Sequence, residues 1–339
     1  MKINRQELLA VLSKVKPGLG GNDLIEQATH FAFMGNKVVT YNDEISISCE
    51  LKNLDITGAI SASELYNFLN RITRDDIDLT VKDNELRLKC GRASAGLTLH
   101  SEIKLPLEEI EGLNKKWVTL PENFINAMTF CRFSCSGDMS MPILNCVHVT
   151  DTCVESSDDI RFTKYDLEDG DGIDNFLIPS NVVKSLSDYA IAEMTGSSSW
   201  KHFRTADKSL TFSCRVYADE YPDTSAISAM DNPTKVKLPK KLGKILTRAG
   251  IFAKERADKD SMITVMLMED KIKIKSKNDA GWFEESTKIK YDGDPITFGM
   301  NPEFLEVMLT KSTVCSIGSD RIMFTGEGWY HIVALTMEV

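Results

Sequence analysis

The stretch Ile60-Ser-Ala-Ser-Glu-Leu-Tyr-Asn-Phe-Leu69 runs from a strand-like end through a polar, cap-like turn into an amphipathic helix pattern. The same pattern recurs along the chain, with successive starts 57, 60, 58, 60 and 62 residues apart. A spacing as regular as this is the signature of a repeat architecture. We therefore predict six helices, one in each copy of the pattern, within residues 3–12, 60–69, 120–128, 178–186, 238–246 and 300–308.

After the helix patterns, the sequence alternates between apolar and polar residues. This alternation predicts half-buried antiparallel strands. The strands are expected at residues 37–41, 45–49, 78–82, 85–90, 263–268 and 271–275. Because the links Lys82-Asp-Asn-Glu85 and Met268-Glu-Asp-Lys271 are short and turn-like, we predict a hairpin at each.

A unit of one helix and a few antiparallel strands cannot cover both faces of its sheet, so the units should pack in pairs. Six units then give three similar α+β domains, each with two helices on antiparallel sheets. The charged stretch at residues 107–116 and the turn-rich stretch at 228–234 are polar and loop-like. We therefore predict domains at residues 1–115, 116–233 and 234–339.

The composition of the 339 residues, with 42% apolar and 27% charged, is that of an ordinary globular protein. No apolar run reaches membrane-spanning length, the N-terminus lacks a signal-peptide pattern, and the eight cysteines are widely spaced. We expect a cytoplasmic protein with no membrane partner. The net charge of −10 argues against a surface that binds nucleic acid everywhere, but leaves local basic patches open.

Several motifs suggest chemistry, but a structural interpretation is favoured for each. Gly18-Leu-Gly-Gly-Asn22 lacks the Gly-Lys-Ser/Thr ending of a phosphate loop, so a helix end and turn is expected. Asp169-Gly-Asp-Gly-Ile-Asp174 places Ile173 where calcium would need an oxygen ligand, which favours a turn. Cys131 and Cys135 have no nearby histidine to complete a metal site, so buried structural cysteines are expected.

The titratable residues form no convincing active site. The five histidines are scattered through strand-like segments, and paired carboxylates such as Asp158 and Asp159 are explained by charged turns. We therefore predict a protein that is not an enzyme, with no catalytic residues, no metal and no cofactor.

The cationic residues are more informative. Residues 235–254 hold seven cations and no acid, and Lys240, Lys241, Lys244 and Arg248 would lie on adjoining faces of the fifth helix. Cations near a helix C-terminus also stabilise the helix dipole, so each one alone fits a structural role. Segregated positive charge in a protein of net charge −10 nevertheless predicts a phosphate-binding surface. Further DNA-binding candidates, on or near the other helices, are Lys14, Lys16, Arg71, Arg74, Arg132, Lys184 and Lys311.

The chain resembles the bacterial and phage DNA polymerase III beta sliding clamps in collinear segments along its whole length. No single motif is diagnostic, but the same order across six units is specific. The segments that carry the resemblance are Met1–Ile3, Leu8–Leu12, Pro17–Gly21, Leu88–Leu97, Pro142–Val149, Ser157–Thr163, Lys237–Glu255 and Val333–Val339.

The resemblance implies a head-to-tail homodimeric ring, with sheets outside and helices lining a hole that holds duplex DNA. Helix spacing agrees with it: six helices packed about 8–10 Å apart would give a ring about 15–19 Å across. Twelve would give about 30–38 Å, which admits a B-form duplex. The resemblance further implies a processivity factor that tethers the replicative DNA polymerase, binds DNA without sequence specificity and is loaded by a clamp loader.

Two more surfaces follow from the resemblance by position. A cleft for linear peptides from partner proteins would be formed by Leu144, Ser157, Asp159, Arg161, Phe162, Pro222, Ile227, Val333, Leu335, Thr336 and Met337. For the aliphatic members of this set, core packing is an equally good interpretation. The joint of the dimer would place Leu105 of one chain against Ile251 and Phe252 of the other.

The chain departs from the family pattern at three places. Asp158-Asp-Ile-Arg-Phe162 stands where the family commonly has Asp-Gly-His-Arg-Leu, and Leu335-Thr-Met-Glu-Val339 replaces the usual Met-Pro-Met-Arg-Leu. Asn22 occupies a position at which many members place an arginine that faces DNA. These changes predict a divergent clamp, of bacterial or phage origin, that binds the peptide of its own polymerase and binds a standard bacterial peptide weakly.

Two other functions remain open from the sequence. The first is a metal-dependent DNA-modifying hydrolase that uses Asp158 and Asp159. The second is a clamp-like scaffold that binds partners but no longer encircles DNA.

Overall fold

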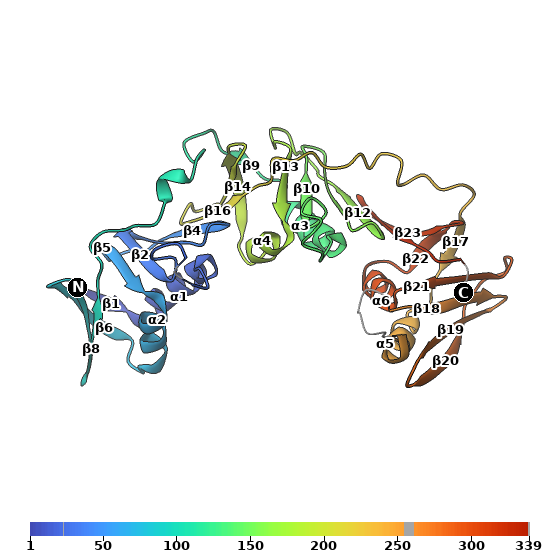
Figure 1. Cartoon of the computed structure of the whole chain (residues 1–339), viewed down its shortest axis with the longest axis horizontal. Helices are drawn as coiled ribbons and strands as arrows, with labels where there is room; N and C mark the ends of the chain where they lie inside the picture. The colour runs from blue at the N-terminus through green and yellow to red at the C-terminus, as the bar shows by residue number, and fades with distance from the viewer. Residues whose placement is uncertain (23, 254–260, 338–339) are drawn as a thin grey trace. The chain divides into compact units, whose positions relative to one another are not determined.

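The structure is a computed structural model that describes residues 1–22, 24–253 and 261–337 (Figure 1). Lys254 of the basic segment and the last two residues, Glu338 and Val339, lie outside the described residues. Within these ranges, no helix has the length and apolar character that a membrane crossing requires.

The repeat of a short strand followed by a helix is confirmed. The described residues form six α-helices, each directly preceded by a β-strand. The helices are α1 (Arg5–Val15), α2 (Ala62–Arg71), α3 (Phe124–Cys131), α4 (Ser180–Leu186), α5 (Leu242–Ala253) and α6 (Pro302–Lys311). The strands before them are β1 (Lys2–Asn4), β5 (Ile56–Ser61), β9 (Val118–Thr119), β13 (Phe176–Pro179), β17 (Thr234–Lys237) and β21 (Ile296–Met300).

Asparagine caps explain where the first and last helices begin. The Asn4 side-chain oxygen accepts hydrogen bonds from the backbone N–H groups of Gln6 and Glu7, at 2.9 and 3.2 Å. The Asn301 oxygen accepts one from Glu303 N–H at 2.8 Å, and Pro302 occupies the first helical position. These caps satisfy N–H groups that have no partner inside the helix.

The chain divides into two compact units. Unit 1 comprises Met1–Thr129, Val147–Thr152 and Glu168–Glu220, and unit 2 comprises Phe130–Cys146, Cys153–Leu167 and Tyr221–Val339. Because the division falls inside the predicted middle domain, it does not test boundaries at residues 115 and 233, which stay a prediction.

Unit 1 contains two antiparallel sheets (Figure 1). The larger has the strand order β5-β2-β3-β4-β16-β15-β14-β9, and the smaller has the order β1-β6-β7-β8. α1 and α2 lie side by side. The remaining strands are β2 (His30–Gly35), β3 (Lys37–Tyr41), β4 (Ile45–Glu50), β6 (Asp76–Lys82), β7 (Glu85–Cys90), β8 (Ala93–Thr98), β14 (Ile191–Gly196), β15 (Trp200–Thr205) and β16 (Leu210–Arg215). β10 (Cys146–Val149) neighbours β13.

Unit 2 also contains two sheets. One has the order β11-β12-β24-β23-β22-β17 within this unit, and the other has the order β20-β19-β18-β21. α5 and α6 lie side by side, and α5 also packs on β19 and β20 (Figure 1). The strands are β11 (Cys153–Ser157), β12 (Arg161–Asp166), β18 (Ile263–Met268), β19 (Lys271–Asn278), β20 (Gly281–Lys288), β22 (Val314–Ile317), β23 (Arg321–Gly326) and β24 (Trp329–Ala334).

Both predicted hairpins are confirmed. β6 and β7 pair Lys82 with Glu85, and the two residues between them, Asp83 and Asn84, have φ angles of 53° and 57°. Two successive left-handed residues suit the twist of a two-residue hairpin, and Asp and Asn tolerate that conformation. β18 and β19 pair in the same way across the predicted turn at residues 269–270.

The fifth helix begins later than predicted. α5 starts at Leu242, after a turn in which the Leu242 N–H donates to the Pro239 carbonyl at 2.9 Å. Lys240 and Lys241 therefore lie in the turn before the helix rather than on its faces, which corrects the prediction. The helix buries Leu242, Ile245, Leu246, Ala249 and Ala253, an apolar stripe with helical spacing.

The cysteines are structural, as expected. All eight belong to the described residues, are buried and form no disulfide. Burial raises the pKa of the Cys135 thiol to about 12, so that this group stays protonated and unreactive. Gly18 ends the short 3₁₀ turn Lys16–Gly18 after α1, which agrees with a helix end rather than a phosphate loop.

Candidate functional site

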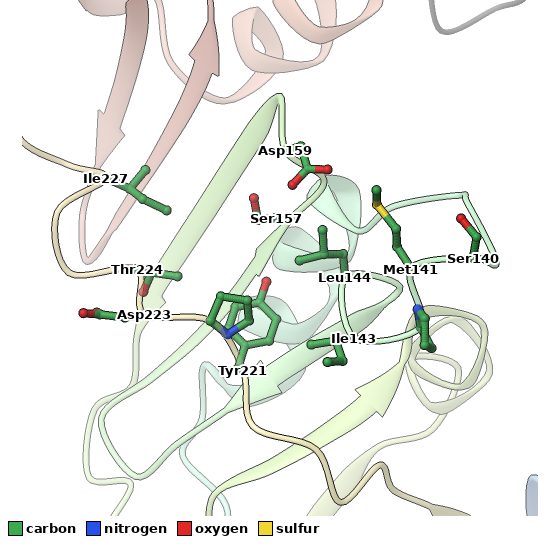
Figure 2. A pocket seen from close by; sticks show the side chains of 12 residues that line it. Ser140, Met141, Ile143, Leu144, Ser157, Asp159, Tyr221, Asp223, Thr224 and Ile227 are labelled. Atoms are coloured by element: carbon green, nitrogen blue, oxygen red, sulfur yellow. The ribbon is translucent and has the colours of Figure 1, made fainter.

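A pocket of about 590 Å³ opens on unit 2 (Figure 2). Three segments that are distant in the sequence form its walls. They are residues 140–144, the turn between β11 and β12, and residues 221–227. The lining residues are Ser140, Met141, Pro142, Ile143, Leu144, Ser157, Asp159, Tyr221, Pro222, Asp223, Thr224 and Ile227.

Hydrogen bonds hold the outer walls. Ser136 N–H donates to the Leu144 carbonyl at 2.8 Å, which fixes the end of the 140–144 segment. On the opposite wall, the Thr224 hydroxyl donates to the Glu155 carboxylate at 2.9 Å, and Arg321 Nη1 donates to the Ile227 carbonyl at 2.7 Å. The 221–227 wall is therefore joined to β11 and β23 of the unit 2 sheet.

The pocket brings together five of the residues expected in the peptide cleft. They are Leu144, Ser157, Asp159, Pro222 and Ile227. Seven further residues complete the walls and were not predicted from the sequence, namely Ser140, Met141, Pro142, Ile143, Tyr221, Asp223 and Thr224. The bend Glu220-Tyr-Pro-Asp223 could have pointed to Tyr221 and Asp223, and the resemblance segment Pro142–Val149 includes Pro142 and Ile143.

The other expected cleft residues do not line this pocket. Phe162 and Val333 are 2% and 1% exposed and belong to the core of the sheet, in which β12 pairs with β24. Their side chains offer almost no surface to a peptide. At the chain end, Leu335 is half-buried and Thr336 pairs with Gly299, whereas Met337 is 42% exposed. A peptide-binding role for these residues stays a prediction.

Arg161 stabilises the turn that carries the pocket residue Asp159. Its Nε and Nη2 atoms lie 2.9 and 2.6 Å from Asp158 Oδ2, and the two side chains are 11% and 13% exposed. The guanidinium carbon also lies 4.6 Å from the ring centre of Phe133 and 4.0 Å from that of Phe304. A planar cation suits both contacts, so Arg161 joins the β11–β12 turn to the 3₁₀ turn at Arg132–Ser134 and to α6.

The Asp158 carboxylate accepts several hydrogen bonds from its own turn. Besides Arg161, it accepts hydrogen bonds from the N–H groups of Ile160 and Arg161, at 3.2 and 2.7 Å. It therefore shapes the turn between β11 and β12. The described residues contain no group of three or more His, Cys, Asp or Glu side chains that could hold a metal ion.

His331 lies on β24 and is buried in the core of unit 2. Its Nδ1 atom is 2.7 Å from the Thr163 hydroxyl, while Nε2 is buried without a hydrogen-bond partner. Burial, reinforced by the Arg161 cation, lowers the pKa of His331 to about 3. The imidazole is therefore neutral in the folded protein at any ordinary pH.

We predict that His331 makes the protein less stable at mildly acidic pH. The unfolded imidazole binds a proton below pH 6.5, whereas the folded one does not until about pH 3. The free energy of unfolding should therefore fall by about 2 kcal/mol between pH 6.5 and pH 5 through this group. Urea unfolding of the protein and of H331Q checks this, since subtracting the variant removes the titration of the other groups. Identical pH dependence in the two proteins would contradict the prediction.

The candidate DNA-binding residues of unit 1 are exposed, namely Lys14, Lys16, Arg71, Arg74 and Lys184. Lys14, Arg71 and Lys184 lie in the last turns of α1, α2 and α4, where a cation stabilises the helix dipole. Lys16 Nζ lies 4.5 Å from the ring centre of Tyr66. These positions fit a structural role and a phosphate-binding role equally well.

The candidate DNA-binding residues of unit 2 differ from one another in their exposure and in their ion pairs. Lys240, Lys241 and Lys244 are exposed, but Arg248 binds the Glu285 carboxylate of β20 through Nε at 3.0 Å and Nη2 at 2.7 Å. Arg248 therefore has a carboxylate partner already. Of the remaining candidates, Arg132 is half-buried, and Lys311 ends α6 with its Nζ 5.6 Å from the ring centre of Phe130.

The predicted joint residues occupy contrasting environments. Ile251 is 65% exposed, and Phe252 stacks on Phe283 with ring centres 6.5 Å apart. Leu105 is only 4% exposed and packs in a core cluster of its own unit with Tyr41, Trp200 and smaller residues. It offers little surface to a second chain, and its role in a joint stays a prediction.

Comparison with solved structures identifies the fold. The structure superposes on the beta subunit of DNA polymerase from Streptococcus pyogenes with a TM-score of 0.85 at 18% identity, covering 99% of each chain. The DNA polymerase sliding clamp from Bacillus subtilis gives a TM-score of 0.84 at 17% identity, covering 100% of this chain and 99% of that one. The sliding clamp from Bartonella birtlesii, solved with bound griselimycin, gives 0.84 at 15% identity, covering 99% and 98%.

These matches confirm the predicted α+β fold class, with the clamp fold of three similar domains, each with two helices packed on antiparallel sheets. No protein-family model and no curated protein sequence matches the chain. At such low identity, the comparisons establish the fold and leave the function to be argued from the residues.

Proposed function

We propose that this protein is a DNA sliding clamp, a non-enzymatic ring of two copies that encircles duplex DNA and tethers the replicative polymerase. The full-length match to the fold of DNA polymerase sliding clamps is the observation that carries the proposal. A ring holds DNA by topology, so it needs phosphate contacts that slide and no base contacts that specify sequence. The clamp loader and the domain boundaries given above are part of the same proposal.

The cations before α5 support DNA binding. Lys240 and Lys241 precede the first residue of the helix, Leu242. The N-terminal end of a helix carries partial positive charge, so the helix dipole repels two lysines at this end and they destabilise the helix. Helix stability therefore does not account for them, while a phosphate backbone nearby would be attracted by both the lysines and the helix end.

The pocket on unit 2 supports tethering. Met141, Ile143, Leu144, Pro222 and Ile227 provide an apolar lining of the kind that seats the anchor side chains of a linear peptide. A polymerase held in this way rebinds its primer at a high effective concentration. Processivity then follows from linkage, without any chemical step in the clamp.

Primer extension tests the tethering proposal. With the cognate polymerase and loader on a long primed template, the protein should lengthen the products made in one binding event by at least about tenfold. The pocket variant L144D should abolish the effect, because it places a charge on the apolar wall. The exposed-site variant M139D is the control and should retain it. Equal product lengths with and without the protein would contradict tethering.

Exposed apolar side chains near one sheet edge support the homodimer. Among the described strands, β20 lies at the edge of its sheet and pairs with β19 alone, and it carries Trp282, which is 71% exposed. Ile251 on α5 is 65% exposed. An unpaired edge with large apolar side chains commonly marks an interaction surface.

We predict that I251D/W282S is monomeric. Light scattering should give the unchanged protein twice the chain mass of 37.9 kDa and the variant one chain mass. Burying two large apolar side chains contributes about 3–6 kcal/mol per joint, so their loss should weaken dimerisation at least about hundredfold. M139D, which changes an 83% exposed methionine, should stay dimeric. A monomer of the unchanged protein at micromolar concentration would count against the ring.

A further inference from the structure

The rim of the pocket is negatively charged, although arginines lie nearby. Asp159, beside β12, and Asp223, on the opposite wall, both line the pocket and are exposed. Figure 2 shows them on two different segments at its edge. Neither forms an ion pair with another described residue. Hydrogen bonds from Ser225 hold the pKa of Asp223 below its usual range, so this group is ionised at neutral pH.

The two arginines that bond to the pocket's supporting segments, Arg161 and Arg321, do not offset these carboxylates. Arg161 is bound to Asp158 at 2.6 Å, and Arg321 is bound through Nε and Nη2 to Asp320 at 2.9 and 2.8 Å. Each cation is neutralised by its own aspartate. The pocket therefore presents two negatively charged carboxylates beside an apolar lining.

The apolar lining is adaptable on one side. Met141 is 42% exposed within the pocket wall. Unbranched, polarisable methionine side chains can repack around different apolar groups. The opposite wall, which is held by the hydrogen bonds of Thr224 and of the Ile227 carbonyl, would fix the position of an anchor.

We propose that the partner segment seated in this pocket is a basic apolar peptide, with lysine or arginine next to its aliphatic or aromatic anchors. This inference rests on the proposed function, because it assigns the partner chemistry of the same tethering pocket. Complementary charge selects partners and speeds association, while the apolar anchors supply most of the affinity. An acidic segment with the same anchors would be repelled by Asp159 and Asp223.

Two labelled synthetic hexapeptides test the inference. They share the anchors Leu and Phe and differ only in two positions, as Gly-Lys-Leu-Lys-Leu-Phe and Gly-Glu-Leu-Glu-Leu-Phe. Titrated into the full chain at low salt, the lysine peptide should bind about tenfold more tightly, which corresponds to exposed charge pairs of modest strength. The preference should shrink to about twofold at high salt, because the ions screen exposed charges.

Variants locate the effect. D159N/D223N should bind both peptides equally, whereas D279N, which removes an exposed carboxylate from the β19–β20 turn, should keep the preference. Equal binding of both peptides to the unchanged protein, tighter binding of the glutamate peptide, or no binding of either would overturn the proposal. A change in solution mass of D159N/D223N would also overturn it, since the pocket would then hold a second copy.

A second measurement tests the proposed sliding-clamp function separately from the basic-peptide inference. The unchanged protein is tested in parallel for retention on circular DNA, which the closed ring rather than the pocket would maintain. Retention with equal peptide affinities would overturn the basic-peptide inference alone, whereas loss of retention would overturn the sliding clamp itself.

Discussion

Replacing Arg161 with alanine should lower the free energy of unfolding of the protein by about 3 kcal/mol. The change leaves the Asp158 carboxylate, only 13% exposed, without its cation, and removes the guanidinium from between Phe133 and Phe304. Removing one partner of a largely buried ion pair costs about 3–5 kcal/mol, because the other charge stays buried without compensation. Urea unfolding followed by fluorescence and circular dichroism measures the loss.

The matched control is R248A, which removes the arginine of another bidentate pair in the same unit. Arg248 and Glu285 are 47% and 37% exposed, so water solvates the remaining carboxylate and the loss should be below about 1 kcal/mol. The double variant D158N/R161A should regain part of the stability that R161A loses, because it removes the uncompensated charge. Equal losses for R161A and R248A would contradict this account of the β11–β12 turn.

Reversing the charge of the three lysines around the start of α5, in K240E/K241E/K244E, should reduce affinity for a short duplex about hundredfold at low salt. Each phosphate contact releases condensed counterions, so three lost contacts should lower the slope of log affinity against log salt by about 2.7. Fluorescence anisotropy of a labelled duplex over a salt series measures both quantities.

The control for this variant is K271E/K277E/K288E, with the same change in net charge on exposed lysines of β19 and β20. Its affinity should fall less than about threefold, with an unchanged salt slope, because those lysines are on strands rather than around a helix N-terminus. If both triple variants lose affinity equally, DNA responds to the overall charge and the segment before α5 has no special role.

The sequence predicted the local features of the fold well. Each strand–helix copy and each hairpin depends on residues close together in the chain, such as the Asn4 and Asn301 caps and the left-handed pair Asp83 and Asn84. The start of α5 was placed too early, because the apolar pattern continues through the Pro239 turn while the helix itself begins at Leu242.

The candidate site was less predictable. Resemblance places a residue along the chain but does not show its exposure, so Phe162 and Val333, whose side chains lie in the core, were grouped with residues that line the pocket. The pair between Arg248 and Glu285 joins residues far apart in the sequence, and no local pattern reports it. Tyr221 and Met141 line one pocket only because the sheet of unit 2 brings their segments together.

The central claim is that two copies of this chain encircle DNA, and retention on a closed circle tests it most directly. The protein is loaded on nicked circular plasmid, separated from unbound protein, and the plasmid is then cut once. A ring should stay on the circle at high salt and leave within minutes of cutting, because topology rather than affinity holds it. Release from the uncut circle at high salt, or equal retention before and after cutting, would contradict the account.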